Sequence, residues 1–163
     1  MNDNFLEHEV AKLLLLLKIT IAVAESCTGG LICHRLTNIS GSSDYLERGV
    51  VTYSNRSKIE LLGVSAQLIK EYGAVSEACV KAMATGIKQL AGTDLGLAVS
   101  GIAGPTGGTP DKPVGTVHMA LAWNEDVQCW KYLFEGCRGE IKQKASDQAL
   151  MRIRDHCQCI KHG

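Results

Sequence analysis

The 163-residue chain has no excess of either charge, because 17 Lys and Arg residues balance 17 Asp and Glu residues. Without a long-range positive field a protein has little to hold a polyanion, so nucleic-acid binding is not expected and only a local basic pocket remains. The sequence also lacks a long hydrophobic run. The apolar stretch 13–17 is far too short to span a bilayer. Acidic residues precede it in place of a basic region, so neither a membrane anchor nor a signal peptide is expected.

No two of the seven cysteines form a C-x-x-C pair, and their odd number leaves at least one thiol unpaired. The five histidines lack the short spacings of a zinc site, and the Cys157-x-Cys159 tail is expected to fray. The sequence therefore predicts no metal and no cofactor. With 45% hydrophobic and 21% charged residues, the composition is that of a soluble globular protein. A reduced, cytoplasmic location fits best.

What the sequence does contain is an alternation of strand-like and helix-like segments. Short apolar runs predict buried strands, and apolar residues at helical spacing predict amphipathic helices. The expected strands are 20–24, 49–53, 95–100, 116–123 and 127–134, and the expected helices are 6–17, 31–38, 55–62, 65–72, 76–90 and 138–154. This order predicts a single-domain α/β fold over residues 1–163, with a mostly parallel or mixed sheet covered by helices. Ligands of such sheets bind beyond the carboxyl ends of the strands, where segments 25–30, 53–58 and 101–115 are expected to meet.

The segment Glu25-Ser26-Cys27-Thr28-Gly29-Gly30 follows the first expected strand and carries a candidate nucleophile. Its glycines allow a tight turn, and free N–H groups at the start of the next helix favour an anion or a developing oxyanion. The Ser26 hydroxyl is well placed there to attack, whereas its neighbour Cys27 is expected to point to the opposite side. The alternative is that Ser26 and Thr28 only cap the helix and the glycines only make the turn.

A second candidate segment is Tyr53-Ser54-Asn55-Arg56-Ser57-Lys58, in which Asn55 is expected to cap a helix. It places a phenol at a strand end and an amine one turn into the next helix. A serine becomes a good nucleophile only when a base removes its proton, and a lysine or tyrosine of lowered pKa can do so. The alternative is a tyrosine at the edge of the core and a solvated lysine.

The segment 101–115 holds five glycines and all three prolines of the chain, so it cannot form regular structure. A loop of this length in a compact domain is usually functional. Its polar residues Thr106, Thr109, Asp111 and Lys112 are candidates to line a pocket or to close it as a lid. A plain surface excursion is the alternative.

A locally basic segment begins at Arg138. From Arg138 to Arg154, five basic residues stand against two acidic ones. An arginine near the start of a helix suits a phosphate group. For the remaining basic residues, a solvated helix face is the more common explanation.

Taken together, these motifs resemble those of the CinA C-terminal family. They are E-S-C-T-G-G, E-R-G-V-V-T-Y-S-N-x-x-K, G-A-V-S-E, S-G-I-A-G-P-x-G-G with K-P-V-G-T-V, and F-x-G-x-R, in that order over about residues 5–155. The chain is similar to the stand-alone nicotinamide-nucleotide amidohydrolases of that family, often called PncC. The added N-terminal domain of longer members is not expected here.

The resemblance implies a metal-independent amidohydrolase that converts nicotinamide mononucleotide to nicotinic acid mononucleotide and ammonia. It implies that Ser26 is the nucleophile and that Tyr53 and Lys58 assist it. Backbone N–H groups near Thr28 and Gly29 are expected to hold the oxyanion. The residues expected to bind the substrate are Glu25, Thr28, Gly29, Gly30, Gly101, Gly104, Thr106 and Arg138, with the phosphate on Arg138.

One position departs from the family pattern, because Lys142 stands where relatives often carry arginine. Lysine keeps the charge but not the two-pronged hydrogen bonding. The resemblance also makes a homodimer possible. Two other readings stay open: a catalytically silent nucleotide-binding or regulatory relative, and a partner protein associated with competence or DNA damage.

Overall fold

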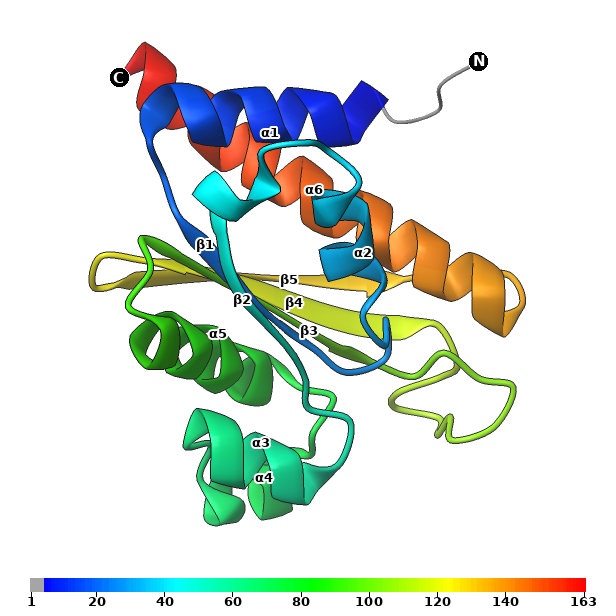
Figure 1. Ribbon diagram of the computed structural model, residues 1–163. Coiled ribbons are helices and arrows are strands. Elements are labelled where there is room, and N and C mark those ends of the chain that lie inside the picture. The colour runs from blue at the N-terminus through cyan, green and yellow to red at the C-terminus, as the bar shows by residue number, and fades with distance from the viewer. Residues whose placement is uncertain (1–4) are drawn as a thin grey trace.

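The computed structural model describes residues 5–163, which form one mixed five-stranded sheet with helices on both faces (Figure 1). The elements are α1 (Phe5–Leu17), β1 (Ile21–Glu25), α2 (Leu31–Thr37), a short 3-10 helix (Ser42–Asp44), β2 (Leu46–Val51), α3 (Asn55–Leu62), α4 (Ala66–Tyr72), α5 (Glu77–Ala91), β3 (Leu95–Gly101), β4 (Thr116–Trp123), β5 (Asp126–Leu133) and α6 (Arg138–His162). The strand order is β2-β1-β3-β4-β5. Strand β1 pairs in parallel with β2 and β3, whereas β4 pairs antiparallel with β3 and β5. The predicted α/β fold with a mixed sheet is confirmed.

The two faces of the sheet carry different sets of helices. Helices α1, α2 and α6 cover one face, and α5 covers the other with α3 and α4 beside it (Figure 1). Side chains of β1 alternate between the two layers, with Ile21 and Val23 in the first core and Ala22 and Ala24 in the second. Strands buried on both faces read as continuous apolar runs, which is why the central strands were recognisable from sequence.

Helix α3 is held against α5 by a close backbone approach. A Cβ atom on Gly86 of α5 would lie 2.1 Å from the carbonyl oxygen of Leu62, so only glycine fits there. Helix α3 has the expected bounds, but the expected cap was wrong. The side chain of Ser54, not Asn55, accepts the N–H of Ser57 at 3.1 Å.

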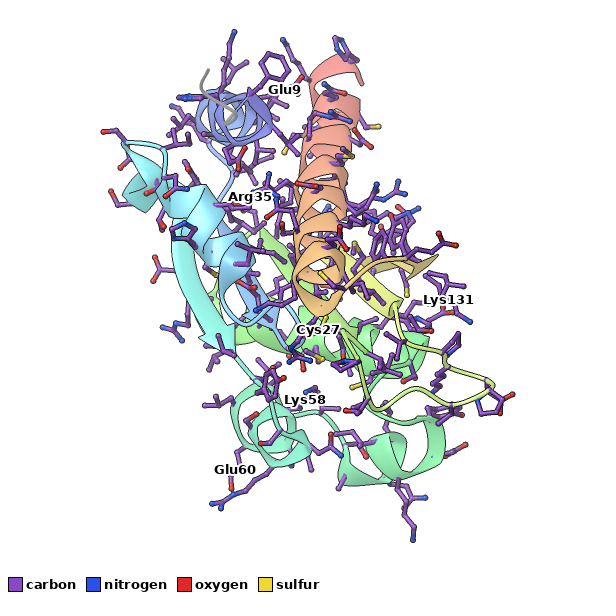
Figure 2. The ribbon with its side chains drawn as sticks, turned by 90° about the vertical axis from the view of Figure 1, so that its right-hand side faces the viewer. Glu9, Cys27, Arg35, Lys58, Glu60 and Lys131 are labelled. Carbon is purple, nitrogen blue, oxygen red and sulfur yellow. The ribbon has the colours of Figure 1, made fainter. Side chains whose placement is uncertain are left out.

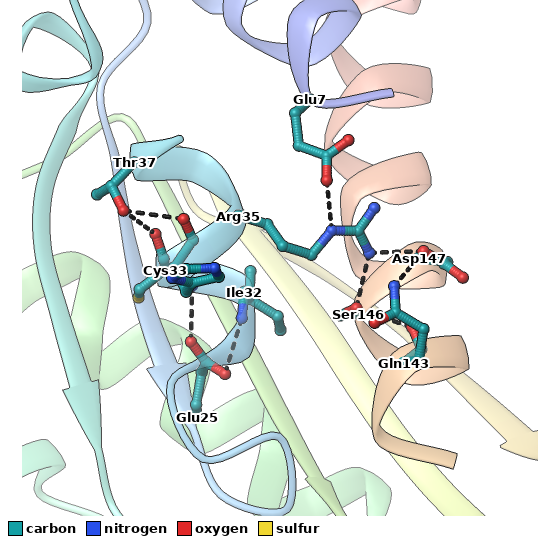
Figure 3. Close-up of polar contacts among 10 residues, drawn as sticks. Glu7, Glu25, Ile32, Cys33, Arg35, Thr37, Gln143, Ser146 and Asp147 are labelled. Atoms are coloured by element: carbon teal, nitrogen blue, oxygen red, sulfur yellow. Dashed lines mark hydrogen bonds and ion pairs between the residues drawn. The ribbon is translucent and has the colours of Figure 1, made fainter. Parts of the chain in front are cut away.

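A buried ionic cluster joins α1, α2 and α6 (Figure 3). Arg35 of α2 is only 8% exposed; its Nε donates to Glu7 at 2.6 Å and its Nη1 to Ser146 at 2.7 Å and Asp147 at 2.5 Å. A buried guanidinium is tolerated only when such partners surround it. The cluster therefore fixes how the three helices of this layer sit relative to one another.

Two expected boundaries were wrong. Helix α6 continues to His162, although the sequence predicted an end at Arg154 and a frayed tail. Cys157 is fully buried in the core, so the helix has an apolar anchor beyond the expected end. The second strand runs over 46–51 in place of 49–53, because this edge strand is largely exposed and gives a weak apolar run.

Within residues 5–163, no helix is both long enough and apolar enough to cross a membrane. The same part of the chain contains no group of three or more His, Cys, Asp or Glu residues placed to hold a metal ion. All seven cysteines are free thiols.

The start of α2 depends on Glu25, the last residue of β1. Its carboxylate is fully buried and accepts the backbone N–H group of Gly30 at 3.0 Å. It also accepts those of Ile32 at 3.1 Å and Cys33 at 2.9 Å (Figure 3). The first N–H groups of a helix have no partner within the helix, and a negative charge is stabilised at that end. Gly30, at the N-cap position, offers no side chain, so Glu25 performs the capping from the preceding strand.

We expect Glu25→Gln to lower the free energy of unfolding by about 2–4 kcal/mol, because the amide keeps one acceptor and turns an NH₂ group toward backbone donors. Urea denaturation followed by circular dichroism measures this change. The control is Glu47→Gln on the exposed part of β2, which we expect to stay within about 0.5 kcal/mol of the wild type. Equal stability of the two variants would contradict the capping role.

Candidate functional site

A cavity of about 270 Å³ lies beyond the carboxyl ends of β1, β2 and β3. It joins the three segments that the sequence predicted to meet. The lining residues are Ser26, Cys27, Tyr53, Asn55, Lys58, Ala74, Val75, Ser100, Gly101, Ile102, Ala103, Gly104, Thr106, Gly107 and Arg138. All three expected catalytic residues are among them.

Ser26 and Lys58 form a buried pair within this cavity. Ser26 follows β1 and is 7% exposed, and Lys58 extends from the first turn of α3 and is 1% exposed (Figure 2). The Nζ atom of Lys58 lies 3.1 Å from the Oγ atom of Ser26. It also donates to the backbone carbonyls of Thr52 at 2.6 Å and Tyr53 at 3.4 Å. A lysine buried this deeply is not the solvated residue of the alternative interpretation.

The two carbonyl contacts determine what Lys58 presents to Ser26. A carbonyl oxygen can only accept, so Thr52 and Tyr53 occupy two of the amine hydrogens. The remaining tetrahedral position points at Ser26 and holds either a proton or a lone pair. Burial lowers the pKa of Lys58, because water no longer stabilises the charged form. The lowered pKa increases the fraction of Lys58 in its neutral form, in which the lone pair of the amine points toward the hydroxyl of Ser26.

Cys27 also lines the cavity, so the expectation that it points away from the site was wrong. Its thiol is nevertheless unsuited to attack. Burial raises the pKa of Cys27 to about 12. Since the thiolate is the nucleophilic form of cysteine, this residue stays protonated and unreactive at ordinary pH. Of the two neighbours, only Ser26 has a base beside it.

Arg138 bridges two segments at the mouth of the cavity. Its Nη2 donates to the hydroxyl of Tyr53 at 2.8 Å, and its Nη1 donates to the carbonyl oxygen of Gly104 at 2.7 Å. Tyr53 is 59% exposed, and it meets Lys58 through its backbone carbonyl, not its phenol. A guanidinium carries five N–H donors, so these two bonds leave three for a ligand.

Four residues expected to bind the substrate lie outside the cavity lining: Glu25, Thr28, Gly29 and Gly30. The carboxylate of Glu25 is occupied by the start of α2, so its role is structural. The N–H of Gly29 donates to the carbonyl of Ser26 at 3.1 Å, and that of Gly30 donates to Glu25. These two N–H groups are therefore not free to hold an oxyanion. Both glycines have positive φ, which the tight turn requires.

The long loop reaches the cavity only through its first part. Gly101, Gly104 and Thr106 line it as expected. Thr109 lies outside both this cavity and a second one that Asp111 and Lys112 help to line. The loop therefore faces two hollows and is not a plain surface excursion.

Reasoning from single residues missed part of the lining. Ala74 and Val75 carry no chemical signal, although they belong to the G-A-V-S-E motif. The segment that bears them is held by Ser100, whose Oγ donates to the carbonyl of Ala74 at 2.9 Å. A serine at the end of a buried strand is the one sign in the sequence that a polar contact is needed here.

The electrostatic character of the cavity follows from its lining. Arg138 supplies a positive charge, and no Asp or Glu is among the lining residues described. Lys142 of α6 lies outside this lining, with its amine 3.6 Å from where a Cβ atom on Gly29 would lie. The site is therefore suited to a negatively charged substrate.

The sequence is similar to those of known proteins. A sequence model described as the CinA C-terminal domain matches residues 3–157. A CinA-like protein of Syntrophus aciditrophicus is 56% identical over 154 residues, which is 94% of this chain and 37% of that protein. The chain spans about a third of the length of the curated relatives it matches.

Solved structures show the same likeness. A CinA superfamily protein from Klebsiella pneumoniae matches with a TM-score of 0.93 and 34% identity, over 97% of this chain and 99% of that one. A competence/damage inducible protein from Agrobacterium tumefaciens matches with a TM-score of 0.89 and 37% identity, over 92% of each chain. The chain therefore belongs to the CinA C-terminal domain family.

Proposed function

We propose that this chain hydrolyses the carboxamide of nicotinamide mononucleotide to nicotinic acid mononucleotide and ammonia. The observation that carries the proposal is the 3.1 Å contact between the amine of Lys58 and the hydroxyl of Ser26, both buried in one cavity. Family membership supports it, because the motifs around these two residues resemble those of the nicotinamide-nucleotide amidohydrolases.

The reaction begins with neutral Lys58, which takes the proton of Ser26 as its Oγ attacks the amide carbon. The N–H group of Cys27, directly after the nucleophile and within the cavity lining, is the candidate to stabilise the oxyanion. Lys58 then gives its proton to the nitrogen, which leaves as ammonia, and the acyl group stays on Ser26 as an ester. A water molecule attacks the ester carbon as Lys58 takes its proton, and Lys58 returns that proton to the Oγ of Ser26 as the acid leaves.

Arg138 supplies the contact for the 5′-phosphate. Its three remaining N–H donors lie at the mouth of a cavity whose described lining has no acidic residue. Bidentate arginine–phosphate pairs are strong and directional. By bridging Tyr53 and Gly104, the arginine also keeps the end of β2 and the long loop together around the nucleotide.

Loss of either member of the buried pair tests the chemistry. We expect Ser26→Ala and Lys58→Met to lower kcat for ammonia release by at least about a thousandfold, because each removes an essential group. The assay uses purified protein, nicotinamide mononucleotide and a chelator. Ser43→Ala and Lys70→Met, at exposed positions, are the matched controls and should keep full activity.

Three results would change the assignment. A folded wild type that binds the nucleotide but releases no ammonia would be a catalytically silent relative. Full activity in Ser26→Ala would mean that the nucleophile is another residue. Loss of activity in Cys27→Ala, with its fold intact, would point to the thiol that burial is expected to keep inert.

The pH profile tests the role of Lys58 as base. Because the neutral amine is required, kcat/KM should rise with pH as Lys58 loses its proton. Burial lowers the pKa of this lysine, so the midpoint of the rise should fall below the value of about 10.4 for a free lysine. Rates measured across the stable pH range give this midpoint. A midpoint at or above that of free lysine would exclude Lys58 as the base.

Substrate comparison tests the role of Arg138. We expect Arg138→Gln to reduce kcat/KM for nicotinamide mononucleotide about 10–100-fold, the cost of losing charge-assisted bonds to phosphate. Nicotinamide riboside lacks the phosphate and serves as the control substrate. Its kcat/KM should fall much less, because only the bridge between Tyr53 and Gly104 is lost for this substrate. If both substrates suffer equally, the arginine only positions Tyr53 and the loop.

A further inference from the structure

A second cavity, of about 630 Å³, lies on the α5 side of the sheet and shares no lining residue with the first. Three lysines from different elements converge on it: Lys81 of α5, Lys112 of the long loop and Lys131 of β5. Figure 2 shows Lys131 well apart from Lys58 and Cys27. The chain between α4 and α5 separates the two cavities, since Ala74 and Val75 line the first and Ser76 lines the second.

His118 of β4 lies at the wall of this second cavity. The residue is only 8% exposed, and its Nδ1 atom has no hydrogen-bond partner within residues 5–163. Buried polar atoms without a partner are rare in folded proteins, and each one calls for an explanation. Lys131 stands directly beside His118 on the neighbouring strand. Nδ1 itself is closed to solvent, so a ligand in the cavity meets the rest of the imidazole ring, with the positive charge of Lys131 beside it.

The charges around His118 are only partly compensated. Lys81 is paired with Glu77 at 2.5 Å. Lys112 donates one hydrogen to the carbonyl of Tyr72 at 2.8 Å, which leaves two on its amine. Lys131 forms no ion pair with any residue in the described part of the chain. Burial and the two lysines, 112 and 131, lower the pKa of His118, and Glu77 opposes them.

We propose that this second cavity binds a small phosphate monoester, whose oxygens are held by Lys112, Lys131 and His118. A phosphate group presents three acceptor oxygens, which match these three groups as donors. With Lys81, Lys112 and Lys131 against Glu77 and Asp111, the lining has an excess of one positive charge, which suits an anion and not a metal cation. Half-exposed Tyr72 offers its ring at the rim to a planar part of the ligand.

The test is calorimetric titration with inorganic phosphate and with adenosine 5′-monophosphate, together with the NMR titration of the His118 imidazole. Phosphate should raise the pKa of His118, because the anion stabilises its protonated form. Lys131→Gln should weaken binding at least about tenfold through the loss of one charge-assisted bond. Lys161→Gln, at the exposed end of α6, is the matched control and should bind as the wild type does. Tighter binding of the nucleotide than of phosphate would assign part of the affinity to Tyr72.

Arg138→Gln separates the two cavities, because it removes the phosphate contact of the first. Retained binding in Arg138→Gln with loss in Lys131→Gln supports the second site. The reverse pattern would place the phosphate in the first cavity and overturn the proposal, as would an unchanged His118 resonance at millimolar phosphate. None of these measurements requires turnover, so their outcome is independent of the amidohydrolase activity.

Discussion

The buried carboxylate of Glu25 constrains the site more than any other single group. Glu25 is the last residue of β1, and its carboxylate binds three N–H groups at the start of α2. The turn between β1 and α2 therefore has little conformational freedom. Ser26 lies within that turn, one residue after the carboxylate. The position of Ser26, the proposed nucleophile, is therefore set by a charge that does not face the cavity. A charged acceptor suits this task, because buried amides without a partner would otherwise destabilise the turn.

The proposed chemistry also needs a base, and the proposed base comes from a different element. Lys58 reaches Ser26 from α3, which follows the neighbouring parallel strand β2. The contact is possible because α3 packs closely against α5 at Gly86, where any side chain would collide with the end of α3. Burying a lysine disfavours its charged form. In most of a protein that is a cost to stability, but at this position it favours the neutral amine that the proposed reaction needs.

The central strands and the bounds of α3 could be predicted from the sequence, whereas the role of Glu25 and the end of α6 could not. The central strands were recognisable because burial on both faces leaves continuous apolar runs. Helix α3 has the expected bounds, but its cap was expected at Asn55 and lies at Ser54. The capping role of Glu25 could not be predicted, because the N–H groups that it binds, the last of them that of Cys33, are brought to it only by the turn at Gly29 and Gly30. The end of α6 was missed because Cys157 is its apolar anchor in a polar stretch.

The pairing of Ser26 with Cys27 shows how the environment selects between two nucleophiles. Both residues line the cavity, and in free solution the thiol would be the more reactive. Burial reverses this order. It holds the thiol of Cys27 in its protonated form, with a pKa of about 12, and it lowers the pKa of Lys58 beside the hydroxyl. One physical cause, the exclusion of water, thus raises the pKa of the Cys27 thiol and lowers the pKa of the Lys58 amine that lies beside Ser26.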